Sequence, residues 1–204
     1  MKVQRHLFAI AIMVTSSVSA LAGVSSEQKR EHLRKLRTAE LRQANVTPLE
    51  RAYLDALNLL GQPGECRAFF GRGAERPLED LVIELHEERM DNASIGIRMS
   101  GPFTLFGQAD ENLSYRLFAR AALNSQGPFF RAKNFPAEPL VPNVGPFGPN
   151  TRAARVLMLM HELAHLIQGK NQEWLIPDDG GNPQLSRQNT STIESRCRAQ
   201  IRNL

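Results

Sequence analysis

Helical spacing of apolar residues is clearest in the segment that follows Thr47. A proline comes directly after Thr47, and Glu50 lies three residues beyond it, which is the pattern of a capping box. Apolar side chains then recur at positions Tyr53, Leu57 and Leu60. Because residues at i, i+4 and i+7 share one face of an α-helix, we expect a helix from residue 48 to a stop at Gly61.

The segment before this helix is dominated by charge. Residues 25–44 are dense in Lys, Arg, Glu and Gln, with a thin apolar stripe formed by Leu33, Leu36 and Leu41. Such a pattern predicts a solvated helix, and a mobile arm is one form that it could take. We assign residues 23–46 to this charged helical arm and residues 47–204 to the main domain.

The middle of the chain gives weaker and mixed signals. Pro77 can begin a helix, although residues 81–85 alone would also fit a strand, and His86 would lie on a solvated helix face. Residues 94–107 predict a strand or a hairpin, divided at Gly101 and Pro102. Asp110 is placed to cap a further helix, whose apolar face would be formed by Leu113, Leu117, Phe118 and Ala121.

A proline-rich segment follows, from residue 127 to residue 150. It holds six of the 12 prolines and four phenylalanines. Proline interrupts helices and removes backbone donors, so we expect a long, stiff loop here. The loop would either form the wall of a cleft or pack onto the core. Together these patterns predict a mainly helical α+β fold with a small sheet or hairpin.

The N-terminus has the layout of a secretory signal peptide. Lys2 and Arg5 precede eight apolar residues at positions 7–14, and a small-x-small site ends at Ala22. A membrane-spanning helix needs about 20 apolar residues, so this run is too short. We therefore assign residues 1–22 to a signal peptide and expect a secreted or periplasmic protein.

Export changes the interpretation of the two cysteines. In an oxidising compartment Cys66 and Cys197 can form a disulfide, and we expect that they do; two unpaired buried thiols are the alternative. The formal net charge is +4, and removal of the signal peptide lowers it by two. A charge this small favours neither nucleic acid nor an anionic membrane as a partner.

The pattern that carries chemistry lies in a strongly apolar segment, residues 152–168. Asn150 or Thr151 can cap this predicted helix, and the sequence His161-Glu162-Leu-Ala-His165 lies within it. Histidines four residues apart lie one turn apart on nearly the same face of a helix, where both imidazoles can bind one zinc ion. Glu162 projects beside them, where it can serve as a general base.

A catalytic zinc site usually takes a third protein ligand. Our prediction is Glu194, on a helix expected at residues 191–202, because an apolar stripe on that helix would turn Glu194 toward the site. Glu194 could instead complete a capping box with Ser191, unless Asn189 caps the helix. Asp178 and Asp179, in a turn-rich stretch, are the alternative: either could be the third ligand, orient a histidine, or only form the turn.

With these residues the chain resembles the zincin metallopeptidases, and Glu194, 29 residues after His165, is similar in placement to the third ligand of the gluzincin branch. The resemblance covers about residues 150–202. It implies that His161, His165 and Glu194 bind zinc and that Glu162 is the general base.

The expected function is that of a secreted zinc metallopeptidase that hydrolyses peptide bonds. The alternative is a non-catalytic secreted zinc-binding module with a structural or interaction role. We expect a peptide or protein substrate, no nucleic acid partner, no membrane-spanning segment after signal cleavage, and a monomer. Tyr53, Tyr115, His86 and several arginines could donate to an oxyanion, and the sequence does not select among them.

Overall fold

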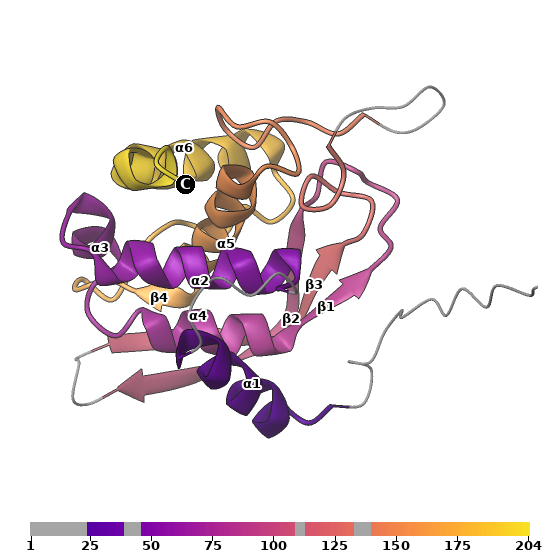
Figure 1. The fold of residues 1–204 in the computed structure, drawn as a ribbon. Coiled ribbons are helices and arrows are strands. Elements are labelled where there is room, and N and C mark those ends of the chain that lie inside the picture. The colour runs from indigo at the N-terminus through magenta and orange to yellow at the C-terminus, as the bar shows by residue number, and fades with distance from the viewer. Residues whose placement is uncertain (1–23, 39–45, 109–112, 133–139) are drawn as a thin grey trace, which may run out of the picture.

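The computed structural model describes residues 24–38, 46–108, 113–132 and 140–204. The expected signal peptide and the expected capping residue Asp110 lie outside these ranges. Within them the chain forms an α+β fold of six helices and four short or medium strands (Figure 1). No helix in these ranges is long and apolar enough to cross a membrane.

The first half of the chain forms four helices. They are α1 (Ser26–Thr38), α2 (Pro48–Gly61), α3 (Glu65–Phe70) and α4 (Glu75–Glu84). The predicted capping box of α2 is confirmed, since Glu50 N donates to Thr47 Oγ1 and Thr47 N donates to Glu50 Oε2. The chain continues from α4 directly into strand β1 (Leu85–Glu88). His86 is thus on a strand rather than on the helix face that we expected.

A small mixed sheet follows, in the order β1-β3-β2. Strands β2 (Ile97–Gln108) and β3 (Leu113–Asn124) are antiparallel, β1 runs parallel to β3, and the two-residue strand β4 (Ile167–Gln168) pairs with Ser114 and Tyr115 of β3. The sequence predicted a strand or a hairpin within residues 94–107, and the structure has one strand there, with an irregularity between Ser100 and Phe103.

The helix predicted after Asp110 is also wrong, because residues 113–124 are strand β3. Leu113, Leu117 and Ala121 are four residues apart. A spacing of four puts residues on one face of a strand and also on nearly the same face of a helix. Pairing with β2 along the strand, from Ile97 with Leu123 to Gln108 with Leu113, decides between the two.

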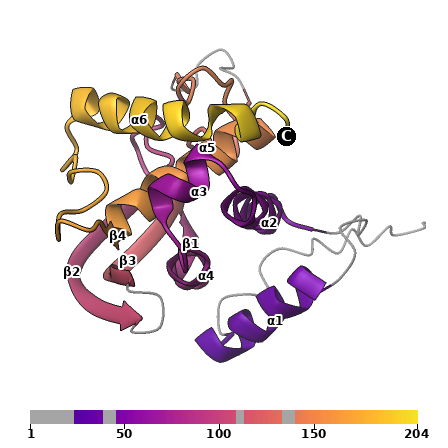
Figure 2. The same cartoon turned by 90° about the vertical axis from the view of Figure 1, so that its left-hand side faces the viewer.

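Helix α5 (Arg152–Leu166) crosses the middle of the domain, where it contacts α2, α4 and α6 (Pro183–Ile201) (Figures 1 and 2). Thr151 caps it by accepting from Ala154 N at 3.2 Å. Most of its side chains are in the core, as the apolar pattern predicted. The proline-rich loop packs onto this core through Phe129, which is fully buried.

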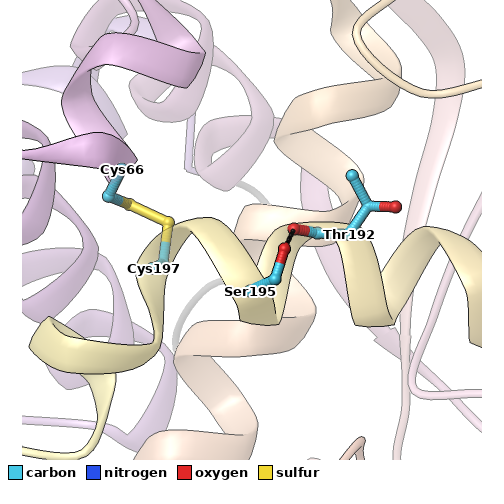
Figure 3. Close-up of a disulfide and its surroundings, with 4 residues drawn as sticks. All are labelled: Cys66, Thr192, Ser195 and Cys197. Carbon is cyan, nitrogen blue, oxygen red and sulfur yellow. Dashed lines mark hydrogen bonds between the residues drawn. A yellow bond between two sulfur atoms is a disulfide. The ribbon is translucent and has the colours of Figure 1, made fainter.

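The predicted disulfide is confirmed: Cys66 of α3 is bonded to Cys197 of α6, with Cα atoms 4.5 Å apart (Figure 3). Both residues are fully buried. The bond closes a loop across a sequence separation of 131, for which chain entropy gives a stabilisation of about 5 kcal/mol. It fixes the C-terminal part of α6 to the first half of the chain.

Candidate metal centre

Helix α5 brings the two predicted histidines together. His161 and His165 lie one turn apart, are 6% and 5% exposed, and have their Nε2 atoms 3.0 Å apart. Placing two polar rings in an apolar helix costs desolvation free energy. Their convergence is what the sequence predicted.

Asp179 completes a group of three possible metal ligands. Its Oδ2 lies 3.5 Å from His161 Nε2 and 3.9 Å from His165 Nε2, and one ligand atom from each of the three residues lies within 4.8 Å of the others. Asp179 belongs to a turn that continues through Gly180 and Gly181, both at positive φ, to Asn182, whose N–H donates to Asp179 O at 2.6 Å. Among the described residues this is the one such group.

The structure does not bring Glu194, our predicted third ligand, into this group. Both carboxylate oxygens of Glu194 accept from Arg198, each at 2.7 Å, and this contact lowers the pKa of Glu194. The alternative that we had left open, a ligand from the turn at residues 178–179, fits the geometry instead.

Helix α6, which carries Glu194, begins earlier in the chain than we expected. Helix α6 begins at Pro183, where the Asn182 side chain accepts from the next two free N–H groups, eight residues before the start that we expected. Ser191 and Asn189 are therefore inside the helix and cannot cap it. Asn189 instead donates to Pro177 O at 2.9 Å and so holds the turn that carries Asp179.

Thr190 of α6 selects which nitrogen of the neutral His161 ring carries the proton. The Thr190 hydroxyl donates to Ser186 O at 2.9 Å, so toward His161 Nδ1, 3.0 Å away, it can only accept. Nδ1 of His161 consequently carries the ring proton, and Nε2 presents its lone pair toward His165 and Asp179. That is the tautomer that a metal-binding imidazole requires.

Neither tautomer satisfies the neutral His165 ring. If Nε2 carries the proton, it donates to His161 Nε2, but the buried Nδ1 then has no donor; if Nδ1 carries it, two lone pairs face each other across 3.0 Å. Among the described residues His165 Nδ1 has no hydrogen-bond partner, and the carboxylate oxygen Asp178 Oδ1 is 3.7 Å away. A cation between the two Nε2 atoms and Asp179 would remove the contact between the two lone pairs, with the His165 proton on Nδ1.

The electrostatics of the group favour metal binding. Burial, reinforced by His161, lowers the pKa of His165 to about 4. Near neutral pH the His165 ring is therefore a neutral imidazole, the form in which histidine binds metals.

Glu162 adjoins the histidines and has a different environment. It is half-buried, and desolvation raises the pKa of its carboxyl group to about 7. A carboxyl group with a pKa near neutrality can both take and return a proton. Its position and its pKa agree with the role of a general base or acid.

The residues considered as oxyanion donors do not join this group. The Tyr115 hydroxyl donates to Asp80 at 2.6 Å, Tyr53 is fully buried beside Glu79, and His86 lies 3.6 Å from Glu88. Two supporting residues were missed altogether, Thr190 and Arg116. A lone threonine in a polar helix and an arginine in a strand carry no signal that sequence spacing could reveal.

No protein-family model, curated protein or solved structure matches this chain.

Proposed function

We propose that this protein is an exported zinc-dependent hydrolase that cleaves peptide bonds. Its metal ligands are His161, His165 and Asp179, and Glu162 is its general base. The observation that carries the proposal is the convergence of two buried imidazoles and a carboxylate beside a glutamate with a raised pKa. Export rests on the signal-peptide pattern and agrees with the buried disulfide.

Zinc is the metal that this donor set fits best. Two neutral imidazoles and one carboxylate are a common protein contribution to a four-coordinate catalytic zinc site, which keeps one position for water or substrate. Zinc supplies Lewis acidity to such a site and makes water acidic enough to react near neutral pH. The close approach of the two Nε2 atoms supports a cation at this place.

The chain's own residues have distinct roles in the proposed reaction. Thr190 keeps the proton of His161 on Nδ1, so that Nε2 is free to bind. The carboxylate of Glu162 takes a proton from the attacking water and then delivers it to the nitrogen of the leaving amine. A pKa near 7 lets this one side chain do both near neutral pH.

A non-catalytic zinc module is the second candidate, because a metal bound by α5 and the turn at 177–181 would also fix α6. Glu162 argues against it. A structural site gains nothing from a glutamate whose desolvation costs stability when it ionises, whereas hydrolysis requires a base at that position.

The test compares Glu162→Gln with the wild-type protein. We expect E162Q to bind one zinc per chain and to lose about 100-fold or more of the hydrolysis of casein or a mixed peptide library. The matched control is E173Q, which changes an exposed glutamate in the adjoining loop and should keep full activity. Full activity of zinc-loaded E162Q would refute the assignment of the base. Zinc binding by a wild-type protein that cleaves no peptide would favour the non-catalytic module.

A further inference from the structure

Arg116 is an almost fully buried arginine in strand β3, and the candidate reaction gives it no role. It is 2% exposed. Neighbouring residues of a strand point to opposite faces, and here both faces are covered: Tyr115 faces α4 and reaches Asp80, while Arg116 faces the end of α5. A buried arginine is rare unless its charge and its donors are matched, so its partners indicate its role.

The guanidinium group joins the histidine helix to the metal-binding turn. Its Nε donates to His165 O at 2.9 Å, one of the carbonyls that the end of α5 leaves without a helical partner. Its Nη1 donates to Asp178 Oδ2 at 3.1 Å, and its Nη2 donates to Asp178 Oδ1. One side chain thus holds the backbone of one candidate ligand and the residue next to another.

Aromatic rings hold Arg116 in this orientation. Its guanidinium carbon lies 3.9 Å from the centre of the Trp174 ring, 4.9 Å from that of Phe118 and 5.3 Å from that of Phe103. Trp174 comes from the same connection between β4 and α6 as the turn itself. Aromatic rings therefore hold the face of the guanidinium group, and hydrogen bonds hold its edge.

We propose that Arg116 is a positioning residue for the metal: by holding Asp178, it places the turn so that Asp179 faces His161 and His165. This inference rests on the proposed function. It adds to the contacts that hold the turn, among them the bond from Asn189 to Pro177 O and the bond from Asn182 N to Asp179 O.

The charges explain why Asp179 rather than Asp178 is the ligand. Arg116 engages both oxygens of Asp178 and neutralises it, which leaves Asp179 as the carboxylate that faces the two histidines. Asp178 retains one further task, since its Oδ1 lies 3.7 Å from the unpartnered Nδ1 of His165. A small movement would let it accept the proton of that nitrogen and orient the ring.

The experiment measures zinc affinity, by competition with a chromophoric chelator, and the visible absorption of the cobalt-substituted protein. The variants are D178N, which keeps the bond from Arg116 to His165 O, and R116K, which keeps the charge but loses the planar fork. We expect each to weaken zinc binding about 10- to 100-fold and to alter the cobalt spectrum. The double variant should lose little more than either single one, because both act through one contact.

The control is R120K, which changes an exposed arginine of the same strand and should bind zinc as the wild type does. D178N decides the result if R116K does not fold. Wild-type affinity and an unchanged cobalt spectrum in D178N would overturn the role of Arg116 while leaving the proposed function intact. A wild-type protein that binds no zinc would instead overturn both.

Discussion

Two clusters of buried polar side chains lie on opposite faces of strand β3, and they differ in how their charges are balanced. On one face, Glu79 and Asp80 of α4 are 6% and 5% exposed. They are paired with three arginines, at distances from 2.8 to 3.4 Å: Arg30, Arg37 and Arg76. On the other face, His161, His165 and Asp179 meet. Among the described residues, this group carries a positive charge only if one of its histidines is protonated.

The difference lies in whether side chains of the chain itself balance the charges. The carboxylates on α4 are paired with arginines of the chain itself, and two of these three arginines come from α1, which also buries Leu33. The charged N-terminal helix is thus docked on the domain and does not project as a free arm. Among the described residues the histidine group is paired with no arginine or lysine, and the zinc proposed above would supply its positive charge.

The largest expected effect is that of zinc on stability. At about 1,000 times its dissociation constant, a ligand that binds only the folded state adds about 4 kcal/mol, which for a chain of this size raises the melting temperature by about 10 °C. We expect this shift in the wild type and in H86A, whose exposed histidine is the control, but not in H165A. Calorimetry with and without chelator measures it, and an equal shift in H165A would refute the comparison.

The cluster of Glu79 and Asp80, whose charges are paired within the chain, should affect folding stability and not zinc binding. Arg30→Met leaves Glu79 and Asp80 without one of their cations, so we expect a loss of about 3 kcal/mol in the free energy of unfolding. Zinc affinity should not change. R34M, at an exposed position of the same helix, is the control for denaturant unfolding. A change in zinc affinity of R30M would show that the two clusters are coupled through β3.

Asp179 and Glu194 can be compared directly as third ligands. D179A should weaken zinc binding about 100-fold, because one of three protein ligands is lost, whereas E194A should leave the affinity unchanged. Titration calorimetry of both variants measures this. The reverse result would restore the ligand that the sequence favoured.

The pH dependence of folding stability, measured on protein from which a chelator has removed the metal, tests the environment of Glu162. A folded-state pKa raised to about 7 gives stability that is present below the unfolded pKa of about 4.5 and is lost as the pH rises through 7. E162Q cannot ionise, so it should melt about 5 °C above the wild type at pH 8 and at nearly the same temperature at pH 4.5. A difference that is independent of pH would show that Glu162 is not desolvated.

The smallest effect concerns Thr190. T190V removes the acceptor for His161 Nδ1, so the ring can take the other tautomer, and we expect zinc affinity to fall about tenfold. T192V is the matched control: Thr192 makes the same type of bond, to Gln188 O, on an exposed part of the same helix. Equal affinities of the two variants would show that Thr190 does not orient His161.

Local patterns predicted the features whose physics is local. The capping box of Thr47, the capped apolar helix of residues 152–166 and the one-turn spacing of His161 and His165 depend on residues within a few positions of each other. The disulfide was also predicted, because only two cysteines were available in a chain expected to be exported.

Tertiary structure decided everything that depends on which distant segments meet. Residues 113–124 fit a helix or a strand equally by spacing, and pairing with β2 made them a strand. Asn182 rather than Ser191 began α6, and this turned Thr190 toward the histidines and left Glu194 with Arg198. Asp179 and Arg116 lie on other segments than the histidine helix, so their approach depends on packing. The sequence thus determined which two imidazoles face one another, and the fold selected the carboxylate that completes the group.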